Sequence, residues 1–433
     1  MNPPAAATIA RAWPPSLAGH DRQWVARIAI SGYLAGFSIL PNEWFHLGSL
    51  TLAGLLAFGG PQDRSRPSHR PRDAGPWLAG AFLAWMTLRS LLSEAAFEGQ
   101  GRGEVVRGLI GTALLVLFNV LTWTAARDRS FLKAAAWVTS LPAAFAALIS
   151  LLLTCCLLPG HQAGERLTNL LVHGGLNPVC TGLIFGFSAL WLAVRAADAS
   201  LPLPRGWVWA LVALLHLAAF MSGSRGAMLA LACGHAALLT AQGWQRGKTA
   251  AAVFLLTGLV YFTASPALPA LPPIASRQAS PVLHRPFQEA MARGDNGRLE
   301  IYRAGWNAVA NPWLGTGQWG VRETWQRELR PESLSVMIHL HSGFFTTFVH
   351  GGLIGLSLLI ALLALAWRRA CRVALEGDAT WIALLAFGSG GLLFDGESLT
   401  SLATAPRFEG LLFWLPVIVA LARGGLTSPP AGS

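Results

Sequence analysis

Charged side chains are scarce in this sequence. Asp, Glu, Lys and Arg make up only 12% of its 433 residues, whereas 53% of the residues are hydrophobic. A soluble globular protein carries about 25% charged residues. The composition therefore excludes an ordinary soluble domain and indicates a chain that lies mostly within a lipid bilayer.

Cysteine is also rare, and none is placed where a disulfide would form outside the membrane. All five cysteines fall in apolar runs or on the side assigned below to the cytoplasm, so no external disulfide framework is expected. The adjacent Cys155 and Cys156 lack the spacing of metal ligands and are interpreted as packing residues. The other three are Cys180, Cys233 and Cys371.

The sequence also shows no pattern typical of a leader and no repeat. The Pro- and Ala-rich start has no compact apolar core with a small-residue cleavage site, so we expect no cleavable signal peptide. The sequence shows no internal repeat and no second soluble domain. We therefore predict a single polytopic membrane domain over residues 1–433.

Long apolar runs recur along nearly the whole chain. Each is close to the ~20 residues that a helix needs to cross a bilayer. The sequence thus predicts an all-α integral membrane protein of about twelve transmembrane helices, and because several boundaries are weakly marked, eleven or thirteen would also fit. The predicted spans are residues 24–40, 45–60, 76–92, 105–125, 131–158, 171–194, 206–221, 226–242, 248–264, 342–367, 379–394 and 408–422.

The basic residues set the predicted orientation. If the N-terminus is cytoplasmic, 18 of the 32 Lys and Arg fall in inner segments, six in short outer connections and eight in one long outer loop. Short loops rich in Lys and Arg stay inside, whereas long loops do not influence topology. Both termini are therefore predicted to be cytoplasmic. The net charge of +11 then anchors the chain in the membrane, and no nucleic-acid partner is expected.

The long outer loop, residues 265–341, separates the ninth and tenth predicted spans. Its first part, residues 266–294, contains six prolines and is expected to be irregular. After Gly297, apolar residues recur at three- and four-residue spacing, which predicts a helix that ends before Pro312. Such a helix is expected on the membrane surface or over a cavity. The apolar stripe consists of Leu299, Tyr302, Trp306 and Val309.

The segment 221–232, MSGSRGAMLALA, has features that favour binding of a phosphate group. Ser222 or Ser224 can cap the helix that follows, and Arg225 falls in its first turn. Backbone N–H groups, the helix dipole and a guanidinium then meet at one place, and arginine binds phosphate through paired hydrogen bonds. The alternative interpretation is an arginine that marks a turn between two short spans.

Two arginines lie on the predicted outer helix. Arg298 shares a helix face with Tyr302, and its position near the helix start opposes the helix dipole, which favours a functional role. Arg303 follows Glu300 by three residues, so an ion pair on a solvated face is sufficient to explain it.

The loop ends in two histidines, His339 and His341, directly before the tenth predicted span. Titratable groups at the end of a membrane helix indicate a functional site. Further ligands at zinc-site spacing are missing, whereas a neutral histidine can act as a general base toward a hydroxyl. An extended backbone would place both rings on one face, so the residue pattern leaves open which of the two is the base.

Two segments at outer helix ends are weaker candidates. The segment 175–178, Gly-Leu-Asn-Pro, opens the sixth span after Arg166 and is interpreted as a broken helix end that lines a cavity. The segment 395–397, Asp-Gly-Glu, follows the eleventh span and has the spacing of either a cation site or a polar turn. Because these acids are far from the histidines in sequence, we predict a site with no metal and no cofactor.

Together these segments resemble the O-antigen ligase family and its wider superfamily of polymerases and ligases. Ligases of this family carry a His followed by Asn, Ser or Gln, then nine residues and a Gly-x-x-Gly-like end, and here His341-Ser342 precedes Gly352-Leu353-Ile354-Gly355 at that spacing. Ser342 stands where many relatives have Asn. The resemblance follows the family order over residues 160–368. The other matching pieces are Ser224-Arg225-Gly226, Gly175-x-Asn177-Pro178, and Arg298, Trp306, Pro312, Gly315 and Gly317.

The resemblance implies a GT-C-like, metal-independent, inverting glycosyltransferase of lipopolysaccharide biosynthesis in the Gram-negative inner membrane, with its site facing the periplasm. The donor would be O-antigen polysaccharide on undecaprenyl diphosphate, and the acceptor a sugar hydroxyl of lipid A–core. The family pattern selects His341 as the base, with His339 beside it. Arginines can neutralise the departing diphosphate, and the residues expected to bind it are Arg225, Arg298, Arg166 and Arg303. The residues expected to support the site are Ser224, Asn177, Tyr302 and Trp306.

Two other interpretations stay open. A repeat-unit polymerase or a protein O-glycosylating ligase would share the donor and the motifs and differ only in the acceptor. A transporter of a lipid-linked glycan would favour internal pseudo-repeats and charges at mid-membrane. Because the charged candidates gather at one outer face, we expect an enzyme.

Overall fold

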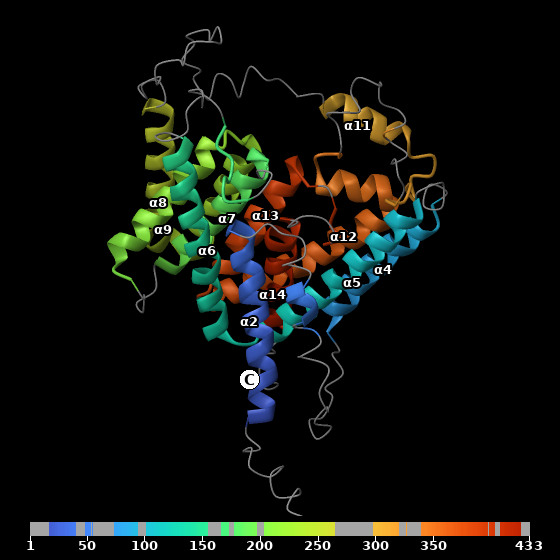
Figure 1. Cartoon of the computed structure of the whole chain (residues 1–433), viewed down its shortest axis with the longest axis horizontal. Helices are drawn as coiled ribbons and strands as arrows, with labels where there is room; N and C mark the ends of the chain where they lie inside the picture. The colour runs from blue at the N-terminus through green and yellow to red at the C-terminus, as the bar shows by residue number, and fades with distance from the viewer. Residues whose placement is uncertain are drawn as a thin grey trace, which may run out of the picture.

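The fold is described from a computed structural model of the whole chain. Helices and no strand make up the regular structure of the described residues, with α6 to α9 on one side, α4, α5 and α12 on the other, and α13 and α14 between them (Figure 1). The structure describes residues 17–39, 48–52, 54, 73–93, 101–154, 166–172, 177–196, 203–264, 298–319, 326, 339–396, 398–402 and 408–425.

Eleven of the labelled helices are α-helices and one is a π-helix. The π-helix η4 leads without interruption into α14, so the last predicted span is one continuous helical segment. In chain order the helices are α2 (Leu17–Ile39), α4 (Ala74–Leu91), α5 (Gly101–Ala125), α6 (Arg129–Leu152), α7 (Pro178–Ala196), α8 (Arg205–Met221), α9 (Arg225–Ala264), α11 (Arg298–Asn307), α12 (Gly343–Leu375), α13 (Thr380–Phe394), η4 (Gly410–Trp414) and α14 (Leu415–Gly424).

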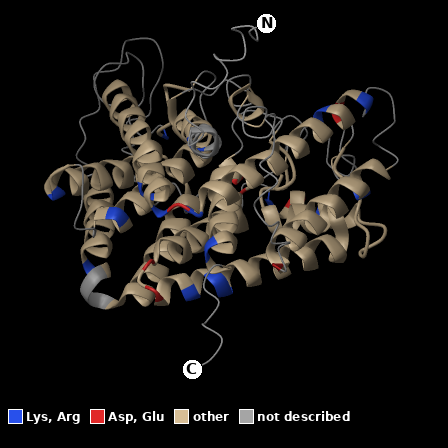
Figure 2. Ribbon diagram, turned by 90° about the horizontal axis from the view of Figure 1, so that it is seen from below, with Lys and Arg blue, Asp and Glu red and all other residues tan. Residues whose placement is uncertain are grey.

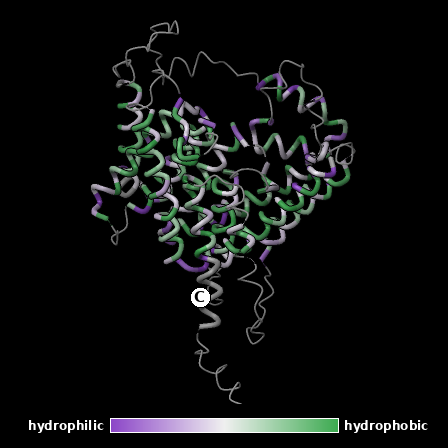
Figure 3. Tube along the Cα trace, in the orientation of Figure 1, coloured by the Kyte–Doolittle hydropathy of each residue, from purple (hydrophilic) through white to green (hydrophobic). Residues whose placement is uncertain are grey.

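Several helices have the length and composition of membrane spans, which confirms the predicted all-α membrane class. Five described helical segments are long and apolar enough to cross a bilayer, and four shorter ones are also apolar. Figure 2 shows long stretches of helix without charged residues, and Figure 3 shows that hydrophobic residues dominate them. The total of twelve spans stays a prediction. Most of the second predicted span and the proline-rich residues 266–294 lie outside the described residues.

Glycines interrupt two of the long helices. At Gly243 (φ 72°) α9 breaks where the sequence separates the eighth and ninth predicted spans. At Gly352 (φ 64°) α12 also breaks, so the predicted tenth span is not one straight helix. A Cβ at Gly352 would lie 2.2 Å from the Trp313 carbonyl oxygen. Glycine is required there, because a side chain fits neither the backbone angle nor the space.

Helix α13, which leads into Asp395, is packed among buried aromatic residues. α13 packs against α9 and α7, and α12 packs against α4, α13 and α14. Edge-to-face ring pairs join α7 to α13, with centroids 5.8 Å apart for Phe187–Phe387 and 5.9 Å apart for Trp191–Trp381. Such pairs add to the stabilisation that burial provides, so the position of α13, and of Asp395 directly after it, is well defined.

We expect a buried ion pair to contribute strongly to stability. The Arg369 side chain is 9% exposed, and its guanidinium bonds to Asp73, which also caps α4 by accepting from the Gly75 N–H. Asparagine would keep the cap, so Asp73→Asn removes mainly the charge and should lower the free energy of unfolding by about 3 kcal/mol, as expected when one partner of a buried pair is lost.

The control is the exposed pair between Glu104 and Arg107, whose charged atoms lie 3.6 Å apart. Glu104→Gln should change the free energy of unfolding by less than about 1 kcal/mol, because solvent screens this pair. Thermal unfolding of both variants in one detergent compares them. Equal losses would show that the Arg369 pair is no more important than a surface pair.

Candidate active site

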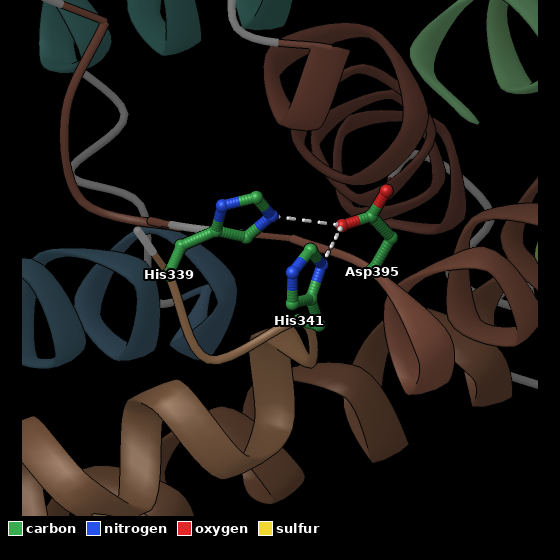
Figure 4. A group of neighbouring side chains, drawn as sticks. All are labelled: His339, His341 and Asp395. Atoms are coloured by element: carbon green, nitrogen blue, oxygen red, sulfur yellow. Dashed lines mark hydrogen bonds and ion pairs between the residues drawn. The ribbon is translucent and has the colours of Figure 1, made fainter. Parts of the chain in front are cut away.

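His339, His341 and Asp395 meet at one point (Figure 4). The His339 Nε2 atom lies 3.3 Å from Asp395 Oδ1, and the His341 Nδ1 atom lies 3.4 Å from the same oxygen. The two imidazole rings are adjacent, with centroids 3.8 Å apart. The Asp395 side chain is 3% exposed, whereas those of His339 and His341 are 14% and 24% exposed. Both histidines thus share one buried carboxylate and keep partial access to the outside.

Packing between the end of α13 and the start of α12 brings these residues together. Asp395 follows α13 in extended conformation, and Gly396 (φ 125°) is so close to α12 that a Cβ there would lie 3.2 Å from the Gly343 nitrogen. Ser342 caps α12 by accepting a hydrogen bond from the Phe345 N–H. Tertiary packing thus closes a gap of 54 residues in sequence and brings Asp395 to His341.

The histidines stabilise the carboxylate form of Asp395. Burial alone would raise the pKa of this carboxyl group, but hydrogen bonds and charge interactions with His339 and His341 outweigh burial, so its pKa lies well below the usual range. Asp395 is consequently an anion at neutral pH and accepts hydrogen bonds from the rings.

The two rings present different nitrogens to the carboxylate. His341 turns Nδ1 toward Asp395, which favours the tautomer with a proton on Nδ1 and leaves the lone pair on Nε2. His339 turns Nε2 toward Asp395, and its Nδ1 atom is buried. Of the two histidines, His341 is therefore the one whose free lone pair fits a base that acts on a substrate.

The backbone of His341 is strained. Its φ is 50°, the only positive value among the described residues other than glycine. Left-handed backbone costs about 1–2 kcal/mol for an ordinary residue, and strain of this kind concentrates at functional sites. The Tyr302 hydroxyl lies 3.5 Å from the His341 carbonyl oxygen and contacts the strained residue.

Helix α11 confirms the helix predicted after Gly297, but its buried face only partly matches the predicted stripe: Tyr302 and Val309 pack against the buried cluster. Ile301, Ala304 and Gly305 face inward, whereas Leu299 and Trp306 are 59% and 65% exposed. Small residues at positions 304 and 305 let α11 approach closely, since a Cβ at Gly305 would lie 2.9 Å from the Phe345 ring. The stripe left out Ala304 and Gly305 because it considered only large apolar residues, whereas close helix packing favours small ones.

Arg298 and Tyr302 lie on the side of α11 near the histidines. Burial raises the pKa of the Tyr302 phenol, Arg298 opposes this effect, and Asp395 adds to it. Both charges therefore act on the Tyr302 hydroxyl. Arg303 is exposed, and the Trp306 ring stacks on Phe348 with centroids 5.4 Å apart. Arg298 and Tyr302 therefore lie next to the histidines, whereas Trp306 packs against Phe348.

The turn before α9 is built as the sequence predicts. Ser224 is the cap, since its hydroxyl accepts a hydrogen bond from the Ala227 N–H at 3.2 Å. Arg225 is exposed at the first position of α9. The Arg166 Nε atom donates to the Ser222 carbonyl at 2.7 Å, which places a second guanidinium beside this turn.

The same turn lies next to the carboxylate segment. A Cβ at Gly226 would lie 3.6 Å from the Cβ of Phe394, the residue before Asp395. Asn177 has a separate, local role, because its side chain accepts a hydrogen bond from the Val179 N–H at 2.7 Å and caps α7. The cavity-lining interpretation of this segment is not needed for Asn177, and Gly175 lies outside the described residues.

The histidine–aspartate group also has metal-ligand spacing. Among the described residues, one ligand atom from each of His339, His341 and Asp395 lies within 4.8 Å of the others. Both ring nitrogens, however, face a single carboxylate oxygen at hydrogen-bond distance. Hydrogen bonding accounts for this arrangement, so absence of a metal stays our prediction. Glu397 lies outside the described residues.

Comparison with known proteins supports one family. Residues 209–360 match the family model described as O-Antigen ligase. This segment is similar to the O-antigen ligase family. The predicted resemblance to this family is thereby confirmed over residues 209–360, a range in which Arg225, Arg298 and His341 lie. Arg166, Asn177 and Asp395 lie outside the matched residues. No curated protein matches the chain.

The sequence missed the role of Asp395 as the partner of both histidines. One signal was present, because Asp395 directly follows an apolar span, and a buried acid at a membrane boundary requires a partner. His339 and His341 precede the tenth predicted span on the same predicted face of the membrane, so they were available for that role.

Proposed function

We propose that the protein is an O-antigen ligase of the Gram-negative inner membrane. It transfers polysaccharide from undecaprenyl diphosphate to a sugar hydroxyl of lipid A–core, with the site on the periplasmic side and both termini in the cytoplasm. The similarity to the O-antigen ligase family and the apolar helices support this proposal. The observation that carries it is the His341–Asp395 pair beside an exposed arginine turn.

The proposed reaction is a single displacement. The acceptor hydroxyl oxygen attacks the anomeric carbon of the donor sugar, and the bond from that carbon to the diphosphate oxygen breaks. His341 Nε2 takes the hydroxyl proton while Asp395 holds the ring and stabilises the imidazolium. The diphosphate leaves with the bonding electron pair, and Arg225 and Arg298, supported by Arg166, neutralise its charge.

Reconstitution tests this function. The purified protein in liposomes is mixed with undecaprenyl-diphosphate polysaccharide and one of three acceptors: lipid A–core, a second lipid-linked repeat unit, or an acceptor protein. We expect the product on lipid A–core. Product only on a repeat unit or only on the protein would assign the site to a polymerase or to a protein-glycosylating ligase, and no product with an intact donor would remove the transferase proposal.

We expect the reaction to proceed in excess chelator at the untreated rate. The reason is that one nitrogen of each ring lies at hydrogen-bond distance from the same Asp395 oxygen, so hydrogen bonds account for the arrangement of the three residues without a metal. The measurement compares initial rates before and after treatment with a chelator, followed by addition of magnesium, manganese or zinc. Loss of transfer that a metal restores would show that His339, His341 and Asp395 act as ligands.

A further inference from the structure

Gln318 links the loop after α11 to the segment that follows Asp395. Its Oε1 atom accepts hydrogen bonds from the hydroxyls of Thr400 at 2.9 Å and Ser398 at 3.2 Å. Ser398 and Thr400 are buried, with 2% and 4% of their surface exposed. The two hydroxyls also lie 3.0 Å from each other. Because buried hydroxyls need partners, Gln318 Oε1 is the acceptor that links both of them to the loop after α11.

The same loop is fixed to the half of α12 that follows His341. The N–H groups of Thr316 and Gly317 donate to the carbonyls of Val349 and His350 at 2.8 and 2.9 Å. These carbonyls belong to the first part of α12, between the cap at Ser342 and the break at Gly352. The loop and the helix that begins next to His341 thus form one hydrogen-bonded unit.

The Gln318 backbone ties this unit to α4, since its N–H donates to the Ser90 hydroxyl at 3.1 Å. The segment after Asp395 has attachments of its own, because the Thr112 hydroxyl donates to the Thr400 carbonyl at 2.9 Å. Loss of the Gln318 side chain should therefore change the relation of two folded segments and leave each segment folded.

We propose that Gln318 is a positioning residue, which holds the segment of Asp395 in register with the helix of His341. This inference rests on the proposed function and adds to it a residue that does not touch the reacting atoms. Catalytic groups must be held within fractions of an ångström, and a displacement of about 1 Å reduces the rate by about 10²-fold. The side chain acts through the His341–Asp395 contact, which at 3.4 Å has little tolerance for further lengthening.

The first test compares two substitutions at this position. Gln318→Leu keeps the size and removes the acceptor oxygen, and should lower kcat about 10- to 100-fold with KM for the donor unchanged. Gln318→Glu keeps oxygens that accept both hydroxyls and should restore most of the rate. The matched control is Gln242→Leu, about 26 Å along α9 from Arg225, which should retain the wild-type rate.

The second test asks whether Gln318 acts through Asp395. In the Asp395→Asn background, Gln318→Leu should change the residual rate by less than about 2-fold, because effects through one shared contact do not add. Full additivity of the two effects, or a wild-type kcat in Gln318→Leu, would overturn the inference.

A readout without turnover separates this inference from the proposed function. Nuclear magnetic resonance of isotope-labelled histidine reports the ring nitrogens of His341, and Gln318→Leu should shift them in the direction seen for Asp395→Asn. An unchanged His341 signal would reject the positioning role even if the protein is an active ligase. An inactive wild type with the expected shift would reject the ligase function and keep the structural link.

Discussion

Replacing Arg225 or Arg298 with alanine should abolish transfer while folded protein remains in the membrane. Arg225 is exposed at the first position of α9, beside the Ser224 cap and Arg166. Arg298 acts on Tyr302 next to the histidines. A departing diphosphate requires this charge in the transition state, so each loss should reduce the rate about 10³-fold or more.

Lysine at either position should restore only part of the rate, because it keeps the charge and loses the paired hydrogen bonds. The matched control is Arg205→Ala, since Arg205 is an exposed arginine at the first position of α8. Initial transfer rates and the amount of membrane-inserted protein are measured for all variants. Wild-type turnover by either alanine variant would exclude that arginine from the mechanism.

The two histidines should differ in importance. His341→Ala should lower kcat about 10²–10⁴-fold, the usual contribution of a positioned base, while donor binding is retained. His339→Ala should lower kcat only about 10-fold, since this residue supports the shared carboxylate and its second nitrogen is buried.

Steady-state rates of both variants, with donor binding measured on the same samples, provide the comparison. A larger loss for His339→Ala than for His341→Ala would reverse the assignment made from the ring orientations. Near-wild-type rates for both variants would exclude histidine base catalysis and leave charge stabilisation by the arginines as the source of the rate.

Features that depend on local sequence could be predicted. The helix at Arg298–Asn307, the Ser224 cap and the boundary at Gly243 follow from spacing, capping residues and a glycine between apolar runs. The family pattern around His341 also lies in one continuous segment. In each case the residues that decide the structure are close together in the chain.

Features that depend on contacts between distant segments could not be predicted. The break at Gly352 is required by the Trp313 carbonyl, which approaches from another loop, and nothing within the apolar run signals it. The pairing of Asp395 with both histidines similarly arises from packing of α13 against α12. The acid–x–acid spacing at residues 395–397 suggested a cation site, because a sequence shows which residues are neighbours along the chain. It does not show that His339 and His341 are the partners of Asp395 in space.

The configuration of the new glycosidic bond tests the central claim, direct attack by an acceptor hydroxyl activated by His341. Nuclear magnetic resonance of the isolated product, compared with the lipid-linked donor, measures the anomeric configuration before and after transfer. Single displacement predicts inversion at that carbon. Retention would contradict the account, because it requires a covalent glycosyl–enzyme intermediate formed on a carboxylate, and Asp395 would then be the nucleophile instead of the partner of the base.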